Sequence, residues 1–118
     1  EDIIAMRTRD NMRIQNLNSI LHALIKYKKH TGQLPPGITS DWKSISNTEI
    51  ALCSYLIPAY ILAIPLDPLN YDDQSQSTIS TCFTPYDTSY QLKISAQTKK
   101  LQLRAPNAEA KNELSVSE

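Results

Sequence analysis

The sequence feature that most constrains the fold is the stretch from Ile3 to His30, which contains neither proline nor glycine. Along its second half, apolar residues recur at steps of three and four, which places them on one face of an α-helix. They are Ile14, Leu17, Ile20, Leu21, Leu24 and Tyr27. Such a helix would be on the order of 40 Å long, which is longer than a small domain can cover. We therefore expect a long N-terminal helix over residues 1–31 with one end projecting.

The two halves of this predicted helix differ in polarity. The segment RTRDNMR, residues 7–13, is polar nearly all round, so we expect the helix to project from the domain up to this point. The buried part then begins at Ile14, and Leu17, Leu21 and Leu24 continue its core-facing stripe. Basic residues at 28–30, Gly32 and two following prolines signal the end of the helix.

Two shorter elements are expected downstream. The sequence SNTE, residues 46–49, has the spacing of a capping box, so it predicts the start of a second, short helix that ends near Pro58. After a polar loop, SYQLKISAQ at residues 89–97 alternates apolar and polar residues, as a half-buried strand does. Its apolar positions are Tyr90, Leu92, Ile94 and Ala96.

The same alternation predicts a small antiparallel sheet. Residues 98–100 are expected to turn the chain into LQLRA, where Leu101 and Leu103 continue the apolar face. The segment TISTCFT, residues 78–84, is expected to supply a third strand. The predicted fold class is therefore α+β, with the long amphipathic helix packed on an antiparallel sheet of about three strands.

The length of the chain fits one domain. We place this domain at residues 1–105, with the helix at 1–31, a connecting region that contains the short helix at 32–77, and the sheet at 78–105. The last residues, 106–118, have little to bury and are expected to form a flexible tail.

The charge balance gives no support for a partner that is bound through net charge. The chain has 12 basic and 12 acidic residues, so net charge does not favour a nucleic acid or an anionic membrane. Apolar residues make up 41% of the chain and are interspersed with polar ones, which is typical of a folded, soluble domain.

Cys53 and Cys82 are the only cysteines. They are too few for a four-ligand zinc site and are not spaced as a redox pair. A disulfide between them is the economical interpretation and would imply an oxidising compartment. It would close a loop of about thirty residues and contribute roughly 3 to 4 kcal/mol in the chain-entropy model. Two buried, reduced thiols are the alternative.

The sequence offers little for catalysis. Neither His22 nor His30 accompanies a serine or cysteine with a recognisable nucleophile signature, and both suit a helix surface or a helix end. Glycine occurs only at positions 32 and 37, so no glycine-rich phosphate loop is present. We therefore expect a protein that is not an enzyme.

One cluster of oxygen donors could suit calcium, namely Asp67, Asp72, Asp73 and Ser75. Its spacing lacks the glycine and the terminal glutamate of a helix-loop-helix calcium site, so a solvated loop is favoured and no cofactor is expected. The basic run of Lys26, Lys28, Lys29 and His30 could bind an anionic partner, although it equally suits the negative end of a helix dipole.

The segment IPLDPLN, residues 64–70, contains two prolines around one aspartate. Pro65 and Pro68 fix their own backbone φ and move the preceding residues, Ile64 and Asp67, away from helical geometry. We expect an extended, stiff connection in which Asp67 caps backbone amides of the next turn.

An ordered set of motifs in this chain resembles the type IV pilin and type II secretion pseudopilin family. In RDNMRIQNLNSILHALIKY, the positions that match the family helix are Arg9, Asp10, Arg13, Leu17, Ile20, Ala23, Leu24 and Tyr27. The glycine and prolines of TGQLPP follow as in the family. IPLDPLN, with Pro65, Asp67 and Pro68, is similar to its Pro-x-Asp-Pro turn, and YQLKISAQ to its tyrosine-leucine strand. The resemblance covers Arg7 to Leu103.

The chain also departs from the family pattern. Asn16 stands where an aspartate often precedes the helix leucine, and no glycine- and aspartate-rich calcium loop follows YQLKISAQ. The second departure removes the best reason to expect calcium.

The resemblance implies a structural subunit of a helical filament, either a type IV pilus or a type II secretion pseudopilus. It implies an apolar helical segment before Glu1, absent here, that would anchor the subunit in the bacterial inner membrane before assembly. Ile3, Ile4 and Met6 would continue the helix packing in the filament. The implied partners are other pilin or pseudopilin subunits and an inner-membrane assembly platform, and the globular part would be periplasmic or at the cell surface.

The alternative is a minor pilin-like secreted module that binds DNA, a glycan or a protein. Its contact surface would be the loop at residues 71–78 together with Lys99, Lys100 and Arg104.

Overall fold

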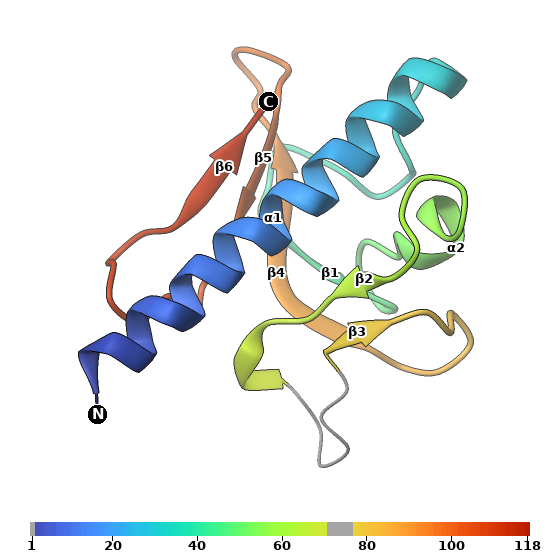
Figure 1. The fold of residues 1–118 in the computed structure, drawn as a ribbon. Helices are drawn as coiled ribbons and strands as arrows, with labels where there is room; N and C mark the ends of the chain where they lie inside the picture. The colour runs from blue at the N-terminus through green and yellow to red at the C-terminus, as the bar shows by residue number, and fades with distance from the viewer. Residues whose placement is uncertain (1, 71–76) are drawn as a thin grey trace.

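The computed structural model describes residues 2–70 and 77–118 of the chain. One long helix crosses a four-stranded antiparallel sheet, and a short helix and a two-stranded sheet lie beside them (Figure 1). The predicted α+β class, with a long helix packed on an antiparallel sheet, is confirmed.

Helix α1 runs from Ile3 to Thr31, close to the predicted bounds. It begins after Asp2, whose side chain accepts a hydrogen bond from the Ile4 amide at 2.9 Å. It ends at Gly32, which has a φ of 83° and donates its amide hydrogen to the Lys28 carbonyl. Since a side chain at this φ would be strained, glycine suits the position.

The main sheet has the strand order β1-β4-β5-β6, with every pair antiparallel. Its strands are Lys43–Ser46 (β1), Asp87–Ile94 (β4), Leu101–Arg104 (β5) and Ser115–Ser117 (β6). The sheet therefore contains one strand more than the roughly three that were expected, because both β1 and β6 add to the predicted β4–β5 pair.

The strand predicted from TISTCFT lies in a different sheet. Only Thr78–Ile79 (β3) is extended, and it pairs with Ile64–Pro65 (β2) in the two-stranded sheet. The edge of β4 where a third strand was expected is taken by β1, whose Ile45 is fully buried. The sequence pattern identified an extended segment here but assigned it the wrong partner.

The core lies between α1 and the inner face of the main sheet. Tyr90 and Leu92 of β4 and Leu101 and Leu103 of β5 are fully buried, as their alternation predicts. Ile94 is half-buried and Ala96 is exposed, because β4 ends at Ile94 and the turn begins earlier than expected.

On the helix side of the core, Leu17, Leu21 and Leu24 are buried as predicted, together with Ile20 and Ala23. Ile14 is only half-buried. The expectation that the helix projects up to residue 13 is wrong, because Asp10 and Arg13 are buried as well.

The prediction of a flexible tail at residues 106–118 is also wrong. Ser115–Ser117 pair with β5, and Leu114 and Ala105 are buried. The run LSVS is too short to show a clear period, yet it supplies the outer strand that covers the edge of β5 next to α1 (Figure 1).

The second helix is shorter than predicted. Helix α2 spans Cys53–Leu56 and ends before Pro58, as expected. The capping-box serine, Ser46, instead belongs to β1, and its hydroxyl accepts the Glu49 amide at 3.3 Å within a turn that precedes Ile50. The local hydrogen bond is therefore present without the helix that it predicted.

Buried and exposed positions of α1 should differ sharply in their effect on stability. Leu24→Ala should lower the free energy of unfolding by about 2 to 5 kcal/mol, because Leu24 is fully buried against the sheet. The matched change Ile4→Ala, at an exposed position of the same helix, should alter it by less than about 0.5 kcal/mol. Urea denaturation of both variants measures the difference, and equal effects would contradict this division of the helix.

Candidate functional site

The most distinctive feature of the structure is a buried ionic cluster around Arg13, whose exposed fraction is 0%. Its Nη1 donates hydrogen bonds to Asp10 Oδ1 at 2.7 Å and to Glu109 Oε2 at 2.8 Å. Its Nε donates to Asp67 Oδ2 at 2.8 Å, and its Nη2 to Asp67 Oδ1 at 3.2 Å. Asp67 therefore binds the guanidinium with both oxygens, which is the strongest geometry for this pair.

Burial alone would disfavour the charge on Arg13 and lower its pKa. The hydrogen bonds to Asp67, Glu109 and Asp10 outweigh that effect and raise the pKa above its ordinary value. The guanidinium therefore stays charged, and its three carboxylate partners come from α1, from the segment after β2 and from the C-terminal region.

Asp10 connects α1 to the C-terminal segment through backbone amides. Its Oδ1 accepts the amide of Glu109 at 3.0 Å, and its Oδ2 accepts those of Ala110 at 2.9 Å and Lys111 at 3.1 Å. Burial acts to raise the pKa of Asp10, but these hydrogen bonds and the one from Arg13 lower it below the usual value. One carboxylate thus fixes three consecutive residues that the sequence pattern placed in a tail.

Glu109 completes the cluster near the surface. Its two carboxylate oxygens accept hydrogen bonds from Arg9 Nε and Nη2, and Oε2 also accepts one from Arg13. Arg9 lowers the pKa of Glu109 most, and with Arg13 it outweighs the opposing effect of burial, so that the pKa falls from 4.5 to about 2.

The segment Pro65–Pro68 contains Asp67 and places it in this cluster. Asp67 is fully buried, and its Oδ1 also accepts the Leu69 amide at 3.0 Å. Pro68–Asn70 (η1) forms a short 3₁₀ turn directly after it. The prediction that Asp67 caps the following turn is confirmed, but its ion pair with Arg13 was not anticipated.

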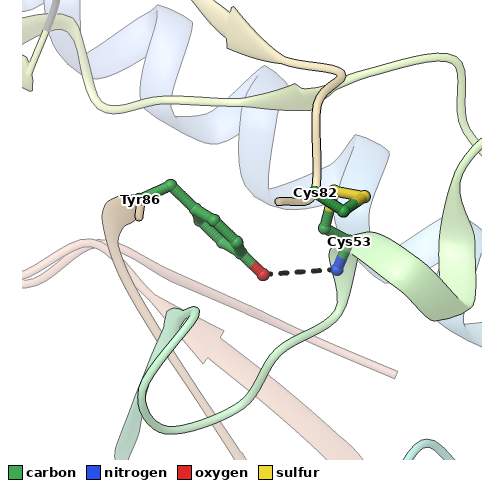
Figure 2. Close-up of a disulfide and its surroundings, with 3 residues drawn as sticks. All are labelled: Cys53, Cys82 and Tyr86. Atoms are coloured by element: carbon green, nitrogen blue, oxygen red, sulfur yellow. Dashed lines mark hydrogen bonds between the residues drawn. A yellow bond between two sulfur atoms is a disulfide. The ribbon is translucent and has the colours of Figure 1, made fainter. Parts of the chain in front are cut away.

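The disulfide between Cys53 and Cys82 is present and joins α2 to the turn after β3, 29 residues further along the chain (Figure 2). The Cys53 amide donates a hydrogen bond to the Tyr86 hydroxyl oxygen at 3.3 Å. Burial raises the pKa of Tyr86, and the Cys53 amide partly offsets the rise. The expected pairing is confirmed, and the alternative of two reduced thiols is not what the structure contains.

The residues expected to drive assembly lie at the start of α1. Ile3 and Ile4 are 47% and 68% exposed, whereas Met6 is half-buried. At the other end of the helix, Lys28, Lys29 and His30 occupy the last turn, where they complement the dipole.

Both histidines lie on α1. His22 is exposed on α1, and His30 Nδ1 lies 2.9 Å from the Tyr60 hydroxyl oxygen. Of the proposed contact residues, Lys99 and Lys100 are exposed in the turn between β4 and β5, but the Arg104 guanidinium lies against Trp42.

Of the four residues that could suit calcium, the structure describes only Asp67. Asp72, Asp73 and Ser75 lie outside the described residues, as does most of the loop proposed as a contact surface. Both oxygens of Asp67 are already bonded to Arg13. Within residues 2–70 and 77–118, no group of three or more histidine, cysteine or acidic residues could hold a metal ion.

Comparison with known proteins returned no match to a protein-family model, a curated protein or a solved structure. Among the described residues, no helix is long and apolar enough to cross a membrane.

The ionic cluster predicts a loss of stability in acid. Since the pKa values of Asp10 and Glu109 are lower in the folded chain than in the unfolded one, the unfolded chain binds more protons as the pH falls. The stabilisation is complete above about pH 5 and should be lost progressively as the pH falls to about 2. Urea denaturation across this range measures it.

The variants Asp10→Asn and Glu109→Gln should each flatten this pH profile, because each removes one of the two shifted carboxyl groups. Asp41→Asn, at an exposed carboxylate without an ion pair among the described residues, is the matched control and should leave the slope unchanged. An equally steep profile in all three variants would contradict the assignment of the acid sensitivity to the cluster.

Reduction of the disulfide should destabilise the domain by about 3 to 4 kcal/mol in the chain-entropy model, given the length of the closed loop. The measurement is the denaturant midpoint with and without dithiothreitol. The double variant Cys53→Ser, Cys82→Ser should match the reduced protein and should not respond to dithiothreitol. Unchanged wild-type midpoints under full reduction would show that the bond adds no stability.

Proposed function

We propose that this chain is the globular part of a filament subunit, in a type IV pilus or a type II secretion pseudopilus, and that its function is structural rather than catalytic. The proposal extends the motif resemblance and is supported by the confirmed architecture of one long N-terminal helix on an antiparallel sheet.

The observation that carries the proposal is the apolar, uncovered start of α1. Ile3 and Ile4 expose much of their side chains in the first turn, while between Asp10 and Leu24 one face of the same helix is buried. Apolar side chains on an exposed helix end gain about 25 cal/mol for each Å² that a partner covers. A second subunit that packs along this end would supply that cover.

The ionic cluster supports the same proposal from inside the domain. A subunit held in a filament by one end of its helix must transmit force from that end to the rest of the domain. Arg13 lies about two and a half turns from Ile4 and is bonded to Asp67 and Glu109 in two other parts of the chain. This crosslink would resist separation of the helix from those two segments.

In this proposal an apolar segment precedes Glu1 and anchors the subunit in the inner membrane before assembly, where the assembly platform receives it. The globular part is then extracytoplasmic, an oxidising location that agrees with the disulfide.

The test is incorporation of the full-length gene product into filaments in the source cell. The double variant Ile3→Asp, Ile4→Asp should reduce the amount of subunit in sheared filaments by more than about tenfold, because two charges would enter an apolar contact. The melting temperature of the globular part should stay close to that of the wild type, because both positions are exposed.

Gln15→Asp, at an exposed position further along α1, is the matched control for an added helix charge. Incorporation of the Ile3, Ile4 variant at the wild-type level would overturn the proposed role of this helix end. The absence of filaments that contain the wild-type chain, under conditions where its machinery is expressed, would overturn the filament proposal itself.

A further inference from the structure

The single tryptophan of the chain lies on the solvent face of the main sheet, not in the core. Trp42 immediately precedes β1. The Lys93 Nζ lies 4.9 Å and the Arg104 Cζ 4.4 Å from the centre of its ring. Arg104 is itself oriented by Gln91, whose Oε1 accepts its Nε at 2.6 Å. The indole is therefore held in place by two cation–π contacts on a rigid sheet.

A hollow of about 250 Å³ lies beside this indole. Its polar lining comes from three strands and the segment before β6: Lys93, Gln102, Glu113, Ser115 and Ser117. Gln102 pairs with Lys93 across β4 and β5, and with Ser117 across β5 and β6. Paired residues in an antiparallel sheet point to the same face, so three neighbouring strands present these side chains together.

The polar side chains of the hollow are not hydrogen-bonded to one another, although the Lys93 ammonium contacts the Trp42 ring. Trp42 and the five lining side chains form no hydrogen bond with any other residue in the described part of the chain. The hollow thus offers an ammonium, an amide, two hydroxyls and a carboxylate, which are donors and acceptors in similar number.

The charges of the hollow favour a neutral ligand. The two charged side chains that line the hollow, Lys93 and Glu113, are opposite in sign, and the Arg104 guanidinium does not line it but is held by Gln91 and Trp42. A polyanion such as a nucleic acid would meet the Glu113 carboxylate and would gain little net attraction. A ligand with closely spaced hydroxyl groups can both donate to the carboxylate and amide oxygens and accept from the ammonium and the amide N–H groups.

We propose that this hollow is a binding site for a neutral oligosaccharide. Sugar hydroxyls bond to Gln102, Ser115 and Ser117 across the sheet, while C–H groups of one sugar ring contact the part of the Trp42 indole that borders the hollow. The site goes beyond the proposed filament function and does not depend on it, because it lies on the face of the sheet that α1 does not cover.

Tryptophan fluorescence provides a direct test, since Trp42 is the only tryptophan. The probes are four neutral oligosaccharides: maltotetraose, cellotetraose, mannotetraose and chitotriose. A saturable change in emission with at least one of them, little altered by added salt, is expected. No change with any of the four would overturn the proposal, as would a response confined to heparin or oligo-dT that salt abolishes.

Variants assign the response to the hollow. Gln102→Ala combined with Ser117→Ala should weaken binding by about tenfold or more, because sugar hydroxyls would lose their partners. Ser54→Ala, an exposed serine of α2, is the matched control and should bind as the wild type does. Trp42→Ala, followed by calorimetry, should abolish binding. Wild-type affinity in the first variant or in Trp42→Ala, with melting curves that show intact folding, would place the sugar elsewhere and overturn the site.

Discussion

A guanidinium that water cannot reach must be surrounded by groups that neutralise and hydrogen-bond it. Arg13 is such a group, because it is fully buried, and the rest of the fold depends on meeting this requirement. Its three carboxylate partners belong to segments that are far apart in the sequence. The requirement is met only when α1, the Pro65–Pro68 segment and the C-terminal region are all in place. Removing any one of them would leave a buried charge without its partner, which makes the three segments mutually dependent.

The sequence predicted the elements that repeat a pattern over many residues. The apolar stripe of α1, the glycine at its end, and the inward positions Tyr90 and Leu92 follow from periodicity and local conformational rules, and the structure confirms them. The disulfide could also be predicted from the sequence, because only two cysteines were present and one bond used both.

Features that depend on contacts between distant segments were not predicted. Asp10 and Arg13 looked like a solvated face of the helix, because a polar residue in a sequence does not reveal a partner that lies a hundred residues away. The three-residue spacing of these two on a helix was the one local signal of an ion pair. The strand β6 is too short to show alternation, and the partner of β3 was set by whether the edge of β4 was already occupied. The hollow beside Trp42 likewise joins strands whose register no local rule specifies.

The contacts made by residues 109–117 affect the order in which the domain can fold. The amides that bind Asp10 belong to residues 109–111, and the outer strand of the sheet is made of residues 115–117. These residues are synthesised after every segment that they contact. Until they are synthesised, Arg13 in the first half of α1 lacks its full set of carboxylate partners. The edge of β5 that pairs with β6 is also still open. Folding from the N-terminus therefore cannot be complete until residues 109–117 have been synthesised, because they hold the first half of α1 in place.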